Sequence, residues 1–181
     1  MAITINGSGI TSSEIADGTI TTDDIASGVT GKVLQIVNYQ TGAFATGTTT
    51  IVMDNTIPQN TEGNEWMTLS ITPTSATSKL RIDVVVYQAC SASETFNGVA
   101  LFQDSTANAL ASSLIAGEAN AERITSHTFS HTMTSGTTSE TTFKVRGGYT
   151  AAGTASFNGR EGSRLMGGVM ASSITITEYE V

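Results

Sequence analysis

The chain has 181 residues, of which 13% are charged, and 16 acidic against 8 basic residues give it a net charge of −8. Eight scattered cations cannot form the basic stripe that neutralises phosphates, so the composition argues against nucleic-acid binding. No run approaches 18 apolar residues, which argues against membrane insertion. The lone Cys90 rules out an intrachain disulfide and a cysteine zinc site, and we expect it in the core.

The N-terminal segment, residues 1–31, contains two copies of a short repeat. Its isoleucines, Ile10, Ile15, Ile20 and Ile25, recur at a constant spacing of five that fits neither a coiled-coil heptad nor strand alternation. Each copy has a Thr and an acid at capping-box spacing and then a Gly, which predicts one short turn. The segment buries too little apolar surface to order itself. We therefore expect it to be ordered by copies of itself or by a partner; an unstructured acidic tail is the alternative.

The remainder, residues 32–181, is predicted to be one all-β domain. Short extended runs alternate with polar turns, and the alternation is clearest in Leu80, Ile82, Val84 and Val86. About eight such runs favour an antiparallel β-sandwich of the jelly-roll type. Residues 107–120 are a weak helical candidate, because glycine and serine interrupt an Ala- and Leu-rich run. The expected strands are 33–39, 49–54, 66–72, 79–88, 99–104, 122–133, 140–146 and 172–179.

The sequence offers little for catalysis. It lacks a nucleophile elbow, a phosphate-binding loop, a zincin motif and a calcium loop. A glycan hydrolase would need two carboxylates about 5–10 Å apart, for which Glu62 with Glu65, or Glu118 with Glu122, are the candidates. We expect both pairs in solvated loops, and therefore no enzymatic activity.

Two histidines, His127 and His131, are expected to share one strand face with Phe129. Threefold symmetry could bring such residues together around a metal ion or in a pH-sensitive contact. We expect ordinary polar or interface positions instead. The sequence therefore predicts no metal site and no cofactor.

Two features could contact a ligand. The loop 158–164 places Arg160 and Arg164 near glycines, a pattern that could bind an anionic sugar or a carboxylate, although contacts between subunits are the more common use. Trp66 could stack on a sugar, although a lone Trp at the start of a strand more often belongs to a core.

Three runs carry a family resemblance: WMTLSITPTSATSKL at 66–80, LFQDST at 101–106 and GGVMASSITI at 167–176. Together with the ITxx(E/D)IAxG repeat, they resemble phage tail-fibre and virion-fibre proteins. The resemblance implies a homotrimer with a jelly-roll, TNF-like knob. These motifs are structural and bring no catalytic residues with them.

The sequence thus predicts a non-enzymatic virion structural protein, a homotrimeric fibre or decoration spike made in the host cytoplasm. Residues 1–31 would be the shaft or docking peg, with Ile10, Ile15, Ile20 and Ile25 at the contact with capsid or tail proteins or between the three chains. Residues 32–181 would form a head that stabilises the particle surface or contacts the host. The alternatives are a lectin-like module that binds a host glycan and, less favoured, a glycan hydrolase.

Overall fold

The computed structural model describes residues 32–93, 95–116 and 123–180, so the isoleucine repeat lies outside the described residues. The described chain is all-β, with one short 3₁₀ turn, Met166–Gly168. Its strands are β1 (Val33–Thr41), β2 (Ala45–Gly47), β3 (Asn64–Ile71), β4 (Lys79–Cys90), β5 (Phe96–Gln103), β6 (Ala111–Ala116), β7 (Thr125–Thr134), β8 (Thr141–Tyr149), β9 (Ala155–Phe157), β10 (Gly159–Arg160), β11 (Ser163–Arg164) and β12 (Ser172–Tyr179).

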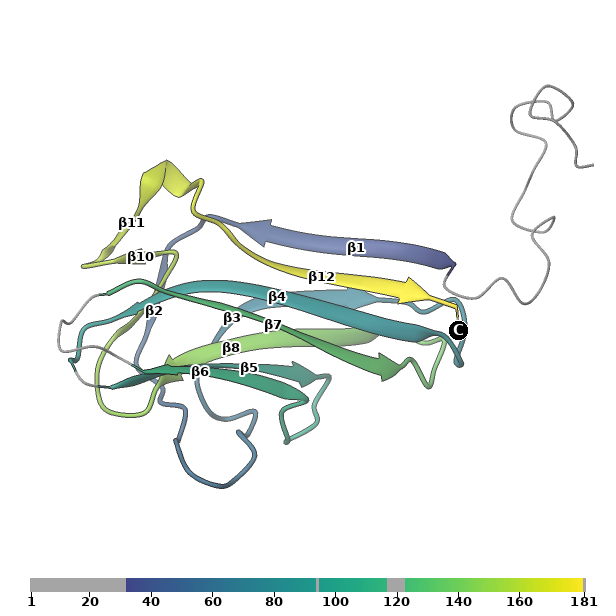
Figure 1. The fold of residues 1–181 in the computed structure, drawn as a ribbon, viewed down its shortest axis with the longest axis horizontal. Helices are drawn as coiled ribbons and strands as arrows, with labels where there is room; N and C mark the ends of the chain where they lie inside the picture. The colour runs from purple at the N-terminus through teal and green to yellow at the C-terminus, as the bar shows by residue number, and fades with distance from the viewer. Residues whose placement is uncertain (1–31, 94, 117–122, 181) are drawn as a thin grey trace, which may run out of the picture.

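Two antiparallel sheets form the sandwich (Figure 1). One sheet runs β1-β12-β4, and β4 then pairs with both β7 and the short β9, which pairs with β2. The other sheet runs β3-β8-β5-β6. Among the long strands, the first therefore lies beside the last, and the second lies beside the second-to-last. This nesting is the strand order of a jelly roll, which confirms the predicted fold class.

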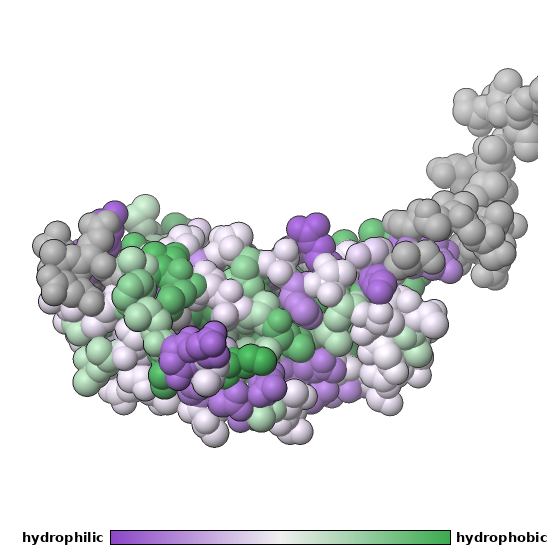
Figure 2. All heavy atoms as spheres, turned by 60° about the horizontal axis from the view of Figure 1, so that its bottom comes forward, coloured by the Kyte–Doolittle hydropathy of each residue, from purple (hydrophilic) through white to green (hydrophobic). Residues whose placement is uncertain are grey.

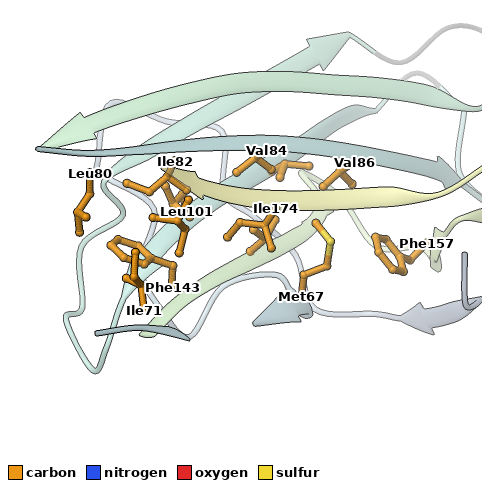
Figure 3. Close-up of a cluster of buried hydrophobic side chains, with 13 residues drawn as sticks. Met67, Ile71, Leu80, Ile82, Val84, Val86, Leu101, Phe143, Phe157 and Ile174 are labelled. Atoms are coloured by element: carbon orange, nitrogen blue, oxygen red, sulfur yellow. The ribbon is translucent and has the colours of Figure 1, made fainter. Parts of the chain in front are cut away.

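The core lies between the inward faces of the two sheets (Figure 3). Leu80, Ile82, Val84 and Val86 of β4 are all fully buried, as their alternation predicts. Opposing strands add apolar side chains of the same kind, so the two sheets share one continuous core. The other members are Met67, Ile71, Val99, Leu101, Phe143, Val145, Phe157, Ile174 and Ile176.

The predicted strand at 49–54 is wrong, because this segment belongs to a loop between β2 and β3. Only Ile51 is buried, and its N–H donates to the carbonyl of Tyr149 at 2.7 Å. The next N–H, that of Val52, donates to the Glu62 carboxylate at 2.7 Å. A backbone carbonyl at the end of β8 and a nearby carboxylate therefore bind these N–H groups in place of a neighbouring strand, which the apolar pattern cannot reveal.

The weak helix at 107–120 is also wrong. Residues 111–116 form β6, whose register with β5 runs from Ala111 opposite Leu101 to Ala116 opposite Phe96. Pairing with β5 overrides the modest helix propensity of Ala and Leu. The expected strand at 172–179 is found with the same bounds and the other expected strands with shifted ends, whereas the short strands β2, β9, β10 and β11 were not expected. No helix among the described residues is long and apolar enough to cross a membrane.

Candidate functional site

Trp66 lies at an irregularity in β3. Glu65 pairs with Arg146 and Met67 pairs with Val145 on β8, which leaves Trp66 as the extra residue of a β-bulge. A bulge interrupts the alternation of side chains and redirects the residue that it contains. As a result, Trp66 and Met67 both pack against the core, while Glu65 remains on the outer side.

The indole of Trp66 is held on two sides. Its ring stacks on Phe157 of β9 with centroids 5.3 Å apart and planes 9° apart. Its Nε1–H donates to Oε1 of Gln88 at 3.3 Å. Trp66 is therefore a half-buried anchor at the edge of the core, and the part that remains accessible lies beside Tyr39 of β1.

Replacing Gly147 with Ala should displace this indole. A Cβ at residue 147 would lie well inside van der Waals contact with Nε1 of Trp66 and Oε1 of Gln88. We expect a loss of about 2 kcal/mol in unfolding free energy, as is usual for overpacking, and a shift in the fluorescence of Trp66. Urea titration and emission spectra measure both effects. Gly153→Ala, where the nearest atom would be 3.2 Å from the new Cβ, is the control; equal behaviour of the two variants would contradict the described packing.

A chain of buried polar groups leads inward from Trp66. Since Oε1 of Gln88 accepts from the indole, its Nε2 is the donor to the Gly98 carbonyl at 3.1 Å, and it also lies 3.5 Å from Nε2 of His127. His127 Nδ1 lies 3.1 Å from Oγ of Ser113. Burial lowers the pKa of His127 to about 4. The imidazole is therefore neutral near pH 7, with Nε2 as acceptor and Nδ1–H as donor.

The two histidines do share one face of β7, as predicted, but they do not form a common site. Four residues along a strand separate them by roughly 13 Å. His127 is fully buried within its own chain, so its ring does not face a neighbouring subunit. Burial also lowers the pKa of the half-buried His131. Across the described ranges, no three His, Cys, Asp or Glu side chains gather in a way that could hold a metal ion.

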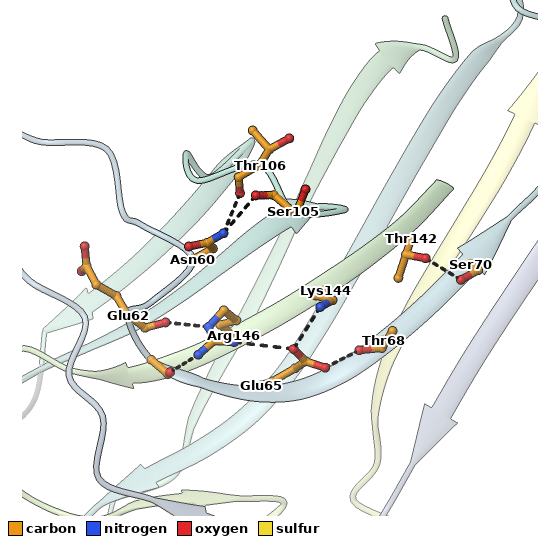
Figure 4. A network of polar contacts seen from close by, with 11 residues as sticks. Asn60, Glu62, Glu65, Thr68, Ser70, Ser105, Thr106, Thr142, Lys144 and Arg146 are labelled. Atoms are coloured by element: carbon orange, nitrogen blue, oxygen red, sulfur yellow. Dashed lines mark hydrogen bonds and ion pairs between the residues drawn. The ribbon is translucent and has the colours of Figure 1, made fainter. Parts of the chain in front are cut away.

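The candidate carboxylates Glu62 and Glu65 are both engaged in structural contacts, of which Figure 4 shows those of Glu65. Oε2 of Glu65 lies 3.7 Å from Nζ of Lys144 and 3.5 Å from Nη1 of Arg146. Oε1 of Glu65 accepts from Thr68 Oγ1 at 2.7 Å. The Glu62 carboxylate instead holds backbone N–H groups of its own loop. The other pair, Glu118 and Glu122, lies outside the described residues.

The arginines of loop 158–164 belong to the hairpin of β10 and β11, which projects at the end of the sandwich remote from the C-terminus (Figure 1). Arg160 forms an ion pair with its neighbour Glu161. Arg164 is exposed, and so are Met166 and Val169 just beyond it. This hairpin therefore presents an apolar surface in addition to its two cations.

One side of the sandwich ends in the free edge of β1. Within the described chain, β1 is hydrogen-bonded to β12 on one side only. Val33, Ile36 and Tyr39 are 52%, 60% and 42% exposed along this strand. A long edge strand with exposed apolar side chains is prone to associate with another chain. This surface could not be predicted from the sequence, because alternation identifies strands without showing which of them lies at an edge.

A second apolar cluster sits on the loop 48–63. Val52, Met53 and Ile57 are exposed on this loop, and Leu114 of β6 is exposed as well; Val52, Met53 and Leu114 line a hollow of about 120 Å³ between the loop and strands β5 and β6. Figure 2 shows green hydrophobic atoms beside purple hydrophilic ones on the side of the molecule that carries this loop. Residues 49–54 of this loop were predicted to be a strand, so the cluster was not predicted.

No protein-family model and no curated protein matches the sequence. The chain is similar in structure to Eiger TNF from S. frugiperda, with 11% identity over 81% of this chain and 92% of that one, and a TM-score of 0.47. It is also similar to latent PorU from Porphyromonas gingivalis, with 11% identity over 84% of this chain and 14% of that one, and a TM-score of 0.42. A chain in the structure of infectious bursal disease virus is similar too, with 16% identity over 82% of this chain and 37% of that one, and a TM-score of 0.36. Because these identities and TM-scores are low, the jelly-roll assignment rests on the strand order of this chain and not on the similarity to other structures.

Proposed function

We propose that this protein is a non-enzymatic structural component of a virion surface. It would be a homotrimeric fibre or decoration spike, attached to capsid or tail proteins by residues 1–31. The jelly-roll body would form the head that stabilises the particle surface or contacts the host. The resemblance of the sequence implies a trimeric state and a phage origin, and the exposed edge of β1 supports an association of copies.

The observation that carries the proposal is the exposed apolar edge of β1. Its unpaired edge and its exposed Ile36 would be covered if another chain associated along this strand. β1 also follows directly after the isoleucine repeat, so the edge strand and the repeat are consecutive in the chain. Association of copies along both would bury the apolar groups that one chain leaves exposed. A second copy of this chain is therefore the occupant that we assign to the β1 edge.

Light scattering on the full-length protein should give a mass about three times 18.7 kDa. Replacing Ile36 with Asp should shift the protein toward monomer at micromolar concentration, because a buried charge would face apolar neighbours at each interface. Ile57→Asp is the matched control, since Ile57 is 52% exposed on the loop 48–63 and away from β1. We expect this control to remain trimeric.

A monomeric wild type would overturn the trimer. A trimer that survives Ile36→Asp and dissociates with Ile57→Asp would move the interface to the loop 48–63. Electron cryo-microscopy of particles that carry the labelled protein then decides between a head and a tail position. Absence of the protein from purified particles would overturn the virion assignment itself.

A further inference from the structure

Besides the three-residue β2, the two sheets of the sandwich have four edge strands, β1 and β7 in one sheet and β3 and β6 in the other. Within the described residues, each of these strands is paired along one side only. Natural proteins protect such edges with charged side chains, bulges or short strands. β3 contains the bulge at Trp66 and the charged Glu65, and β6 is only six residues long. These two edges are therefore protected.

The edges of β1 and β7 lack this protection. Neither strand contains an Asp, Glu, Lys or Arg residue. β7 pairs with β4 from Thr125 to Thr134 without a register shift. β1 begins with a bulge and then pairs regularly with β12 from Gln35 to Thr41. Both strands are thus long, regular and uncharged, which is the kind of edge to which another strand can be added.

The two unprotected edges lie at opposite sides of the same sheet, in the order β1-β12-β4-β7 (Figure 1). Every neighbouring pair in this order is antiparallel, so β1 and β7 run in opposite directions. A second copy placed beside the first, without being turned over, would therefore bring β1 and β7 together as an antiparallel pair. The register also aligns outward side chains across the sheet, as in the row Gln40, Ser173, Val85 and Thr128.

Both edges also leave apolar side chains of the inward face incompletely covered. On β7, Phe129 and Met133 pack against the core but are only partly buried. On β1 the same holds for Val37, and Tyr39, which is opposite the buried Ile174, is 42% exposed. Joining β1 of one copy to β7 of the next would bring these side chains close together and extend the core across the contact.

We propose that the free edge of β7 receives β1 of a second copy, so that one sheet continues from copy to copy. The inference rests on the trimer proposed above and names the surface that meets β1 within it. In a closed ring of three copies, each contact joins two different surfaces, whereas pairing of β1 with β1 would stop at a dimer. β7 is the counter-surface because it is the other unprotected edge of that sheet.

The first test is a charge on the edge of β7. Ser130 is exposed on this strand, and Ser130→Lys adds a cation of the kind that keeps natural edge strands apart. We expect it to weaken association about tenfold. Ser112→Lys is the matched control, because Ser112 is exposed on the edge strand β6 of the other sheet, and it should associate like the wild type. Light scattering over a dilution series of the full-length protein measures both variants.

Disulfide cross-linking tests the contact directly and does not depend on a loss of stability. Gln40→Cys on β1 is combined in turn with a cysteine on the same face of β7, at Ser126, Thr128, Ser130 or Thr132. Two strands separate β1 from β7 within one chain, a distance of roughly 14 Å that no disulfide spans. The natural Cys90 is buried. We expect at least one combination to yield covalent trimers on a non-reducing gel, whereas Gln40→Cys alone should yield no cross-linked species.

The outcomes separate this inference from the trimer itself. A monomeric wild type would overturn both. A trimer that dissociates with Ile36→Asp but not with Ser130→Lys, and that forms none of the four cross-links, would keep the trimer and refute the pairing of β1 with β7. Disulfide-linked dimers of Gln40→Cys alone would show that β1 pairs with β1 of another copy, which also refutes it.

Discussion

Replacing Glu178 with Ala should lower the free energy of unfolding by about 3 to 5 kcal/mol, one of the largest effects of any single substitution in the sandwich. Glu178 lies near the end of β12 and is fully buried. Its Oε1 accepts from the backbone N–H of Thr74 at 2.9 Å, from that of Ser75 at 3.2 Å and from Oγ of Ser78 at 2.6 Å. Its Oε2 accepts from Nε2 of Gln35 on β1 at 2.6 Å. Removing the carboxylate would take an acceptor from all four donors; Gln35 and Ser78 would keep the carbonyls of Thr72 and Ser75, whereas the N–H groups of Thr74 and Ser75 would lose their partner.

The same carboxylate should make stability depend on acid pH. Burial raises the pKa of Glu178, but hydrogen bonds from Ser78, Gln35 and Thr74 outweigh burial and lower it from 4.5 to about 2. A carboxyl whose pKa is depressed in the folded state stabilises the protein above its unfolded pKa. That contribution is lost as the pH falls from about 4.5 to about 2. Urea unfolding of the wild type should therefore weaken across this window.

Glu178→Gln should be less stable at neutral pH and should lose that part of the pH dependence. Glu180→Gln, two residues further along and exposed, is the matched control and should behave like the wild type. If the wild type and Glu178→Gln show the same slope between pH 4.5 and 2, the carboxylate is not held ionised by its neighbours in the way described.

Most of the fold could be predicted from side-chain periodicity. Strands that are buried on one face, such as β4 and β12, show the pattern in full, because each alternate residue faces the core. The segment 49–54 shows the same apolar signal, yet there Ile51 alone is buried and the Glu62 carboxylate binds the backbone. Local hydrogen bonding by a residue further along the chain cannot be read from alternation. The segment of β6 was ambiguous for another reason: its Ala and Leu residues favour a helix, and only its pairing with β5 makes it a strand.

The candidate site was predictable only in part. The sequence singled out Trp66 as a core residue that could also contact a ligand; it packs against the core, and the part that remains accessible lies beside Tyr39. Tyr39 is distant from Trp66 in the sequence but lies near it in the fold, because β1 and β3 are the edges of opposing sheets on the same side of the sandwich. Glu65 was considered as half of a catalytic pair, whereas its contacts to Lys144 and Arg146 hold it as an acceptor. Only the strand order brings these groups together.

Deleting residues 2–28 should leave a soluble β-sandwich that unfolds cooperatively but no longer attaches to its virion. The described core is formed by residues that all lie after β1 begins, so no part of it is removed. The start of β1 is fixed from within the sandwich, since Gln35 donates to Glu178 and the N–H of Glu180 donates to the carbonyl of Lys32 at 2.9 Å. The deletion variant should therefore still unfold in one cooperative urea transition.

Attachment should depend on the isoleucines, because they are the large apolar groups of the repeat. Ile15→Asp combined with Ile25→Asp would place charges against apolar neighbours and should cost several kcal/mol per chain at the contact, a penalty that threefold symmetry would multiply. Ser13→Asp with Ser27→Asp adds the same charge at polar positions and should leave attachment intact. The measurement is the number of copies bound per particle after assembly with each variant. Full occupancy by the deletion variant or by the double isoleucine variant would show that the β-sandwich, not the repeat, is the anchor.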